Sequence, residues 1–226
     1  MSAGAYYPLF ADLHGRRCVV VGGGMVAQRK VTTLLDYGAA ITVVSPTATR
    51  RLLAYARRGT VRYLARAFRP ADLRGAWLAH AATDDQRINR LVFRTAARLR
   101  LFANVVDQKP LCSFIAPAIV KRGDLVIAIS TGGMSPAVAK RLRRELTAHV
   151  GADYARLLKL LGGLRDVAKS RLPNFQVRKR YFDRLVDGRV FALVRAGKTH
   201  AARREALALL DGYANHGHWG RDAASP

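Results

Sequence analysis

Apolar runs and amphipathic stretches alternate along the first half of the chain. The segment Arg17–Val21 is almost continuously apolar, which is typical of a strand in a buried parallel sheet. The stretch Met25–Tyr37 instead places its apolar side chains on one face of a helix. Strands that alternate with helices predict a doubly wound parallel sheet of the α/β class. The same pattern predicts further strands at 41–44, 60–64, 76–82 and 101–106, with helices at about 47–58 and from 83–85 to 99.

The pattern changes after Asp107. Two apolar runs flank Arg122-Gly123-Asp124 and predict a β-hairpin, and Ser135-Pro136 opens a helix. From Gly151 onward the pattern is helical. We therefore predict a sheet domain over 1–112, a hairpin-plus-helix segment over 113–150 and a small helical C-terminal domain over 151–226. The expected elements are strands at 113–121 and 125–130 and helices at about 136–149, 152–170, 174–186, 189–196 and 198–213.

The charge balance is strongly basic, with 39 Lys plus Arg against 15 Asp plus Glu and a formal net charge of +24 in 226 residues. Such a surface attracts polyanions, and nucleic acid, acidic membranes and polycarboxylate metabolites all qualify. Half of the residues are hydrophobic, which excludes a disordered basic tail and is enough to build a core. Charge alone therefore does not choose the partner.

Several classes of protein are excluded by what the sequence lacks. It has no run of about 18 apolar residues, and its first residues lack the basic-then-apolar layout of a signal peptide. Cys18 and Cys112 are too few for a disulfide framework or a zinc site, and we interpret them as small buried hydrophobic residues. His216 and His218 lie in a Gly-containing end that makes a poor preorganised metal site. The sequence therefore favours a cytoplasmic protein with no resident metal.

Three glycines come directly after the first predicted strand and directly before the first predicted helix. With Ala27 they form G-x-G-x-x-A, the pattern of a Rossmann-type dinucleotide-binding loop. Gly22 would allow the tight turn, and Gly24 would let a pyrophosphate approach the free amides of the helix. A glycine-rich turn that binds nothing is the alternative. The residues expected to hold NAD here are Gly22, Gly23, Gly24, Met25 and Val26.

The ribose end of the predicted cofactor site departs from the usual pattern. An acidic residue about 20 positions after the glycines normally holds the ribose hydroxyls. This chain has Ser45, Pro46 and Thr47 at the end of the second predicted strand, and their two hydroxyls would bond a ribose only weakly. Arg50 and Arg51 follow and could meet a 2′-phosphate. The choice between NAD and NADP therefore stays open at this point.

Four motifs stand in register along residues 6–150. They are Gly22-Gly23-Gly24-x-Val26-Ala27-x-Arg29-Lys30, Ala81-Ala82-Thr83-Asp84-Asp85 with Asn89, Asn104-Val105-Val106-Asp107, and Ile129-Ser130-Thr131-Gly132-Gly133-x-Ser135-Pro136. Through these motifs the chain resembles the precorrin-2 dehydrogenase / sirohydrochlorin ferrochelatase family, the N-terminal module of siroheme synthases. The remaining residues are similar to this family only in their helical character.

The resemblance implies a definite chemistry and assembly. Members of this family pass a hydride from precorrin-2 to NAD, which gives sirohydrochlorin, and some also insert ferrous iron to give siroheme. They form intertwined homodimers, in which the segment after the nucleotide domain crosses to the partner, and 113–149 would be that segment here. A chain of this length has no room for the methyltransferase module of longer siroheme synthases.

The resemblance also implies that Asp107 is the catalytic carboxylate. Elementary chemistry agrees, because Asp107 follows a predicted parallel strand, at the sheet edge where open α/β folds bind ligands. Removal of a hydride and a proton calls for a base near the reacting carbon, and so does deprotonation of pyrrole nitrogens for metal insertion. The alternative is an aspartate that only caps a helix or stabilises a turn.

A second polar loop lies between a predicted strand and a predicted helix and is interpreted as substrate-binding. Its small residues and hydroxyls can present donors to an anion, and the resemblance implies substrate carboxylates. A simple turn with Ser135 as helix cap is the equal alternative. Thr83 is expected near the cofactor, Asp84 or Asp85 as a helix cap, and His80 as a packed residue. The residues of the loop are Ser130, Thr131, Gly132, Gly133 and Ser135.

The charge also suggests a different class of function, an NAD(H)-sensing module that binds a polyanion such as nucleic acid. No helix-turn-helix with a distinct recognition helix is evident in the sequence. The basic and aromatic cluster Arg178–Phe182 has helical spacing, at which the aromatic side chains more often pack inward. The sequence therefore favours the enzyme over the nucleic-acid binder.

Overall fold

The structure is a computed structural model that describes residues 6–216. The chain forms two compact units. The first contains Met1–Ala116 and Gly132–Met134, and the second contains Pro117–Thr131 and Ser135–Pro226, each over its described residues. Residues 217–226, which include His218 of the C-terminal histidine pair, lie outside the described range.

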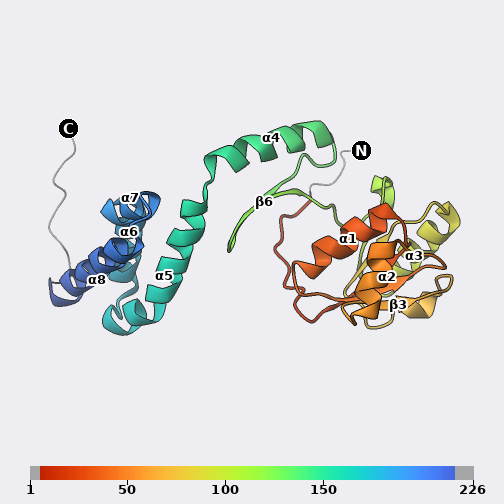
Figure 1. Ribbon diagram of the computed structural model, residues 1–226, viewed down its shortest axis with the longest axis horizontal. Helices are drawn as coiled ribbons and strands as arrows, with labels where there is room; N and C mark the ends of the chain where they lie inside the picture. Colours follow the sequence, from red (N-terminus) through yellow and green to blue (C-terminus); the bar gives the residue numbers. More distant parts are fainter. Residues whose placement is uncertain (1–5, 217–226) are drawn as a thin grey trace. The chain divides into compact units, whose positions relative to one another are not determined.

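The first unit holds a five-stranded parallel sheet in the order β3-β2-β1-β4-β5 (Figure 1, red to yellow-green). This order confirms the predicted doubly wound, Rossmann-type α/β fold. The strands are β1 (Arg17–Val21), β2 (Ala40–Val44), β3 (Arg62–Leu64), β4 (Leu78–Ala81) and β5 (Phe102–Val105). The helices are α1 (Met25–Leu35), α2 (Arg50–Arg57) and α3 (Gln86–Arg98), with 3-10 turns η1 (Pro70–Leu73) and η2 (Lys109–Leu111).

The two faces of this sheet explain why four successive residues of β1, Cys18 to Val21, are apolar. Cys18 and Val20 of β1 join a core with α1 and α2, whereas Val19 and Val21 point to the opposite core with α3. Successive side chains of a strand alternate between faces, so a strand that is covered on both sides must be apolar throughout. All four residues are at most 2% exposed.

Short polar side chains fix where the helices begin. Thr49 caps α2, with its Oγ1 accepting a bond from the Leu52 backbone nitrogen at 3.3 Å. Asp85 caps α3 by accepting bonds from the backbone nitrogens of Arg87 at 2.8 Å and Ile88 at 3.3 Å. These bonds hold the pKa of the Asp85 carboxyl below its usual value. The expectation that Asp84 or Asp85 caps this helix is thus confirmed, with Asp85 as the cap.

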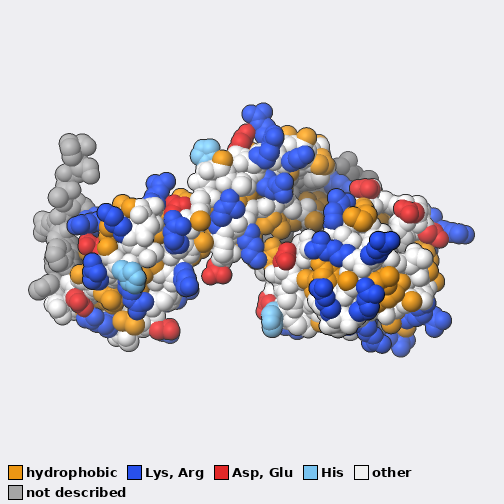
Figure 2. Space-filling view, viewed as in Figure 1, with side chains coloured by type: hydrophobic (Ala, Val, Ile, Leu, Met, Phe, Trp, Pro, Cys, Tyr) orange, Lys and Arg blue, Asp and Glu red, His pale blue; other side chains and the backbone are white. Residues whose placement is uncertain are grey.

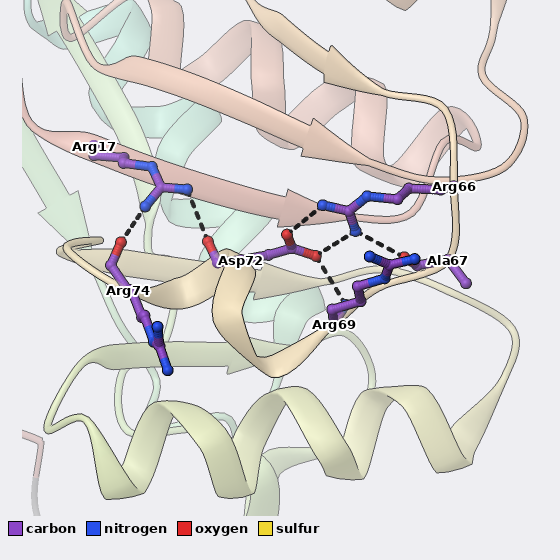
Figure 3. A network of polar contacts seen from close by, with 6 residues as sticks. All are labelled: Arg17, Arg66, Ala67, Arg69, Asp72 and Arg74. Carbon is purple, nitrogen blue, oxygen red and sulfur yellow. Dashed lines mark hydrogen bonds and ion pairs between the residues drawn. The ribbon is translucent and has the colours of Figure 1, made fainter.

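A polar network that the sequence did not predict ties η1 to the sheet (Figure 3). The Asp72 carboxylate accepts two bonds from the Arg66 guanidinium, at 2.6 and 2.8 Å, and one from the backbone nitrogen of Arg69 at 2.8 Å. Arg17, the first residue of β1, donates to the carbonyl oxygens of Asp72 at 2.8 Å and of Arg74. The connection between β3 and β4 is therefore anchored to the start of the central strand.

The second unit combines the predicted hairpin with helices. Strands β6 (Ala118–Arg122) and β7 (Leu125–Ile129) are antiparallel and joined at a turn where Gly123 has φ +58°. A core of residues at most 4% exposed joins α5 to α8, and within it the Tyr181 hydroxyl donates to the Ala206 carbonyl at 3.0 Å. The helices are α4 (Pro136–His149), α5 (Ala152–Arg171), α6 (Phe175–Asp187), α7 (Arg189–Arg195) and α8 (Thr199–His216). Among the described residues, no helix is both long enough and apolar enough to cross a membrane.

Candidate functional site

The fold itself requires the first two glycines of the loop after β1. Gly22 has φ +122°, and a Cβ on it would collide with the carbonyl oxygen of Ala82, just after β4. A Cβ on Gly23 would collide with the carbonyl oxygen of Thr47, just after β2. The loop is therefore wedged between the chain segments that leave β2 and β4, and any side chain at Gly22 or Gly23 would force that wedge open.

Gly24 differs from its two neighbours because nothing in the protein requires a glycine there. It has φ −78°, and a Cβ on it would have no atom within 4 Å. Gly24 is also the N-cap of α1, with no side-chain cap bond and no acidic residue in the first turn. Within the described residues the first amides of α1 therefore have no hydrogen-bond acceptor. A pyrophosphate fits this arrangement, because it needs free N–H donors and close backbone approach.

The residues expected near the ribose lie beside the glycine loop. Ser45 is buried, and its carbonyl oxygen accepts a bond from the Tyr63 hydroxyl at 2.9 Å, while Pro46 and Thr47 are exposed. The backbone nitrogen of Thr49 donates to the Gly23 carbonyl oxygen at 3.0 Å. These contacts fix the segment after β2 against the glycine loop.

Thr83 lies on the other side of the loop, after β4. Its hydroxyl bonds to Oδ1 of Asn89 at 3.0 Å and to the Asp85 carbonyl oxygen at 3.1 Å. Asn89 is 2% exposed and donates back to the Thr83 carbonyl oxygen at 2.9 Å. Asn89 thus holds the segment that a Cβ at Gly22 would strike, which explains structurally why Asn89 accompanies the motif at 81–85.

Asp107 lies beyond the end of β5, at the same carboxyl edge of the sheet as the glycine loop. It is the third residue of a turn closed by a bond of 3.3 Å from the Gln108 backbone nitrogen to the Val105 carbonyl oxygen. Its φ is +58°, in the left-handed region that this turn position normally reserves for glycine or asparagine. Within residues 6–216 its exposed carboxylate has no hydrogen bond or ion pair. Asp107 is therefore strained and free to meet a ligand.

Two polar side chains on neighbouring strands, His80 of β4 and Asn104 of β5, contact each other inside the sheet unit. His80 is 5% exposed, and its Nδ1 lies 3.3 Å from Oδ1 of Asn104. Burial and, to a smaller extent, the charge of Lys30 lower the pKa of His80 to about 3, although the bond to Asn104 acts in the opposite direction. His80 is therefore neutral at physiological pH. The expectation of a packed histidine agrees with this burial.

Lys30 belongs to the site, although the sequence named it only as the last residue of the glycine-loop motif. Burial lowers the pKa of Lys30, and Arg29 lowers it further, whereas Cys112 and Asp107 act in the opposite direction. Within the described chain, the Lys30 side chain has no hydrogen bond or ion pair. The site therefore contains a half-buried ammonium group whose charge acts on both Asp107 and Cys112.

Lys109 is a second residue that the sequence analysis missed. Its Nζ donates to the Gly132 carbonyl oxygen at 2.7 Å, and its side chain packs on Gly133. Lys109 thus fastens two glycines of the predicted substrate loop to the segment after β5. Within the second unit, the Thr131 hydroxyl bonds to both backbone groups of Ser135, and the Ser135 hydroxyl accepts from the Val138 nitrogen at 3.3 Å as the cap of α4. Ser135 therefore caps α4.

The described residues contain no group of three or more His, Cys, Asp or Glu side chains arranged to hold a metal ion. The groups at this edge of the sheet include backbone amides, the Asp107 carboxylate and the Lys30 ammonium group. This set is suited to a dinucleotide and an anionic substrate.

Three family models cover the chain in sequence. They are described as NAD(P)-binding over residues 9–118, as sirohaem biosynthesis protein central over 122–149, and as sirohaem synthase dimerisation region over 153–210. The chain belongs to the siroheme synthase family. The region that matches the dimerisation model lies in the helical part after residue 150.

Individual members of the siroheme synthase family are about 40% identical to this chain. "Siroheme synthase 1" of Pectobacterium atrosepticum is 42% identical over 200 residues, which cover 88% of this chain and 42% of that relative. "Siroheme synthase" of Thioalkalivibrio sulfidiphilus is 41% identical over 198 residues, covering 88% of this chain and 40% of the relative. The chain therefore spans about two fifths of the length of these curated relatives.

A solved structure matches nearly the whole chain. It is that of "SirC, precorrin-2 dehydrogenase", with a TM-score of 0.73 and 28% sequence identity, and the match covers 92% of this chain and 100% of that one. The siroheme synthase family and this structural match agree with the α/β fold and with a nicotinamide cofactor.

Proposed function

We propose that this chain oxidises precorrin-2 to sirohydrochlorin with NAD as the hydride acceptor. The observation that carries the proposal is that two features lie at the same edge of the sheet. One is the open backbone at Gly24 at the start of α1, and the other is the Asp107 carboxylate, which has no hydrogen bond or ion pair within the described residues. The likeness to a precorrin-2 dehydrogenase over its full length supports the substrate. We also propose that the protein works in the cytoplasm.

Each residue of the proposed mechanism has one role. The backbone at Gly22, Gly23 and Gly24 and the first amides of α1, those of Met25 and Val26, hold the pyrophosphate, with Ser45, Pro46, Thr47 and Thr83 lining the cofactor. NAD supplies the hydride acceptor. Asp107 takes the proton that precorrin-2 loses with the hydride, so that one hydride and one proton leave and sirohydrochlorin remains. Lys30 adds a positive charge beside Asp107.

The substrate carries carboxylates, and we propose that the loop of Ser130, Thr131, Gly132, Gly133 and Ser135 receives them. The contact between Lys109 and Gly132 supports a substrate loop fastened to the segment that carries the base. The basic charge supports steering of an acidic substrate. Figure 2 shows Lys and Arg side chains distributed over the visible face of both units rather than gathered in one patch, and this distribution favours a small anion over a nucleic-acid groove.

We further propose that the protein is a homodimer with the parts 1–112, 113–150 and 151–226. Helix α4 supports this, because it buries no residue and exposes Val138 and Leu142. The match of 153–210 to a dimerisation model supports a contribution from the helical part too. Sedimentation of the purified chain tests this assembly, and a monomer at micromolar concentration would overturn it.

We propose NAD rather than NADP as the cofactor. Arg51, one of two arginines that could hold a 2′-phosphate, has its Nε 2.9 Å from the Tyr55 hydroxyl and its guanidinium over the Tyr55 ring. This contact directs Arg51 along its own helix. Steady-state kinetics with each cofactor tests the choice, together with Arg50→Ala. A higher kcat/KM with NADP that Arg50→Ala abolishes would reverse it.

Insertion of ferrous iron into sirohydrochlorin is the second activity we propose, because both curated relatives described above carry the name siroheme synthase. Ferrous iron is a substrate in this step, and the base that takes the pyrrole protons would again be Asp107. Addition of ferrous or cobaltous ion to purified sirohydrochlorin, with spontaneous metalation subtracted, tests it. A metalation rate equal to the spontaneous rate would overturn this second activity and leave only the dehydrogenase activity.

The dehydrogenase proposal is tested by incubating the protein with precorrin-2 and NAD. We expect NADH and the sirohydrochlorin spectrum to appear together. Asp107→Ala should remove most of the activity and leave NAD affinity unchanged, while Asp84→Ala, at an exposed carboxylate on the same edge, should remain active. Absence of hydride transfer with either cofactor would overturn the proposal, and salt-resistant binding to DNA would support the nucleic-acid alternative instead.

A further inference from the structure

The thiol of Cys112 contacts the backbone on both sides of Asp107. The Val105 backbone nitrogen donates to Sγ at 3.3 Å. Sγ lies 3.2 Å from the carbonyl oxygens of both Val105 and Gln108, to either of which the thiol proton can be donated. These two residues are the first and last of the turn in which Asp107 is the third. One side chain therefore clamps both ends of that turn.

The clamped turn needs such a restraint because Asp107 is strained. Residues other than glycine adopt the left-handed region less readily than extended or right-handed conformations. Asp107 holds φ +58°, and within residues 6–216 its own carboxylate makes no bond that would stabilise the turn. The left-handed backbone aims the carboxylate differently from any ordinary strand end. Without an external restraint, the turn would relax and the carboxylate would move.

The position of the thiol is fixed from behind by buried groups. Nδ2 of Asn104 lies 3.5 Å from Sγ and donates to the Phe114 carbonyl oxygen at 3.1 Å. Asn104 is held in turn by His80, whose ring packs edge-on against Phe114 with centroids 5.5 Å apart. Burial raises the pKa of the Cys112 thiol, so the thiol stays protonated and remains a donor.

We infer that Cys112 is a positioning residue that holds the Asp107 carboxylate in its working direction. The thiol suits this role because its one sulfur atom can accept a bond from an amide and donate its proton to a carbonyl oxygen. The inference rests on the proposed function of Asp107 as the base. It also corrects the interpretation of Cys112 as a small buried hydrophobic residue, since the side chain is half-buried and makes polar contacts.

The first test is kinetic and compares Cys112→Ala and Cys112→Ser with the native enzyme. We expect Cys112→Ala to lower kcat about 10- to 100-fold, as for a misplaced base, with KM for precorrin-2 and Kd for NAD within twofold. Cys112→Ser keeps a donor and an acceptor and should recover most of kcat. Cys18→Ala is the matched control, because Cys18 is 0% exposed and packs in the core with α1 and α2, and it should lower thermal stability without lowering kcat.

The second test does not depend on activity. The three-bond HN–Hα coupling and the Cα chemical shift of Asp107, measured by NMR on the full chain, report its backbone conformation. We expect Cys112→Ala to lose the left-handed signature and Cys112→Ser to keep it. A native-like Asp107 conformation and kcat in Cys112→Ala, or an equal loss of kcat in Cys18→Ala, would overturn the inference. An inactive native enzyme whose turn is still released by Cys112→Ala would overturn the proposed function but not the clamp.

Discussion

The guanidinium of Arg66 grips the carboxylate of Asp72 with two parallel bonds, from NH2 to Oδ1 at 2.6 Å and from NH1 to Oδ2 at 2.8 Å. Asp72 is 7% exposed and the Arg66 side chain 34% exposed, so one partner is buried and the other meets solvent. Such a pair matters to folding stability because a buried carboxylate that has lost its cationic partner is strongly destabilising. It closes the segment between β3 and β4 and thereby supports the strand that contacts the glycine loop.

Replacement of Asp72 by Asn should destabilise the sheet unit by about 2 kcal/mol, less than for a fully buried pair because solvent reaches Arg66. Arg66 and the Arg69 amide hold the pKa of Asp72 below its ordinary 3.8, so its contribution is complete above pH 3.8 and is lost as pH falls through the lowered folded pKa. Urea unfolding measures both effects, with Asp84→Asn as control. An unchanged unfolding midpoint in Asp72→Asn would contradict the prediction.

Gly24→Ala should impair NAD binding, whereas Gly23→Ala should impair folding. Gly24→Ala places its Cβ in open space and should fold normally, yet NAD affinity should fall at least about tenfold, because the Cβ occupies the room of the pyrophosphate. Gly23→Ala would strike the Thr47 carbonyl and should unfold at markedly lower temperature. Calorimetric titration and thermal melts separate the two outcomes. Native NAD affinity in Gly24→Ala would place the pyrophosphate elsewhere.

His80 should make folding sensitive to mild acid. Its pKa is about 3 in the folded protein and 6.5 when exposed, so the unfolded chain binds the extra proton between these values. Stability should therefore fall as pH decreases below about 6.5, a window well above that of Asp72. NMR of the ring checks the assignment directly. Ring signals that titrate between pH 5 and 8 in the folded protein would show that His80 is not sealed from solvent.

Two substitutions at Asp107 should separate strain from chemistry. Both Asp107→Gly and Asp107→Ala remove the carboxylate and should abolish turnover. Glycine tolerates φ +58° whereas alanine does not, so the glycine variant should be more stable than the alanine variant by about 1 kcal/mol. Chemical denaturation of the two variants gives this difference. Equal stability would mean that the turn is not left-handed in solution.

The sheet domain was predictable because its strands are buried on both faces. The run Cys18–Val21 is apolar for the cores on each side, and the glycine loop that follows has no other common context. Helix ends were less certain: Asp84 and Asp85 offer the same carboxylate to the helix, and only backbone geometry selects Asp85. For the same reason α2 begins at Arg50, after the Thr49 cap, and not at 47.

The site was predictable where one segment carries the chemistry and not where two segments meet. In the sequence Lys30 is only the end of the glycine-loop motif, and its proximity to Asp107 follows from the order of strands in the sheet. Arg66 and Asp72 lie six residues apart in an irregular segment, and every acidic group of this basic chain has many cations to choose from. Lys109 likewise needs the loop at Gly132 folded back before its role is visible.

The order β3-β2-β1-β4-β5 puts the two halves of the proposed chemistry on strands of unequal protection. The cofactor loop lies among the ends of β1, β2 and β4 at the centre of the sheet. The turn of Asp107 follows β5, which is an edge strand of the described sheet and pairs only with β4. Edge strands open at lower free energy than central ones. Gentle heating or low concentrations of denaturant should therefore create a population of molecules that still bind dinucleotide and no longer turn over, a state in which occupancy and catalysis are uncoupled.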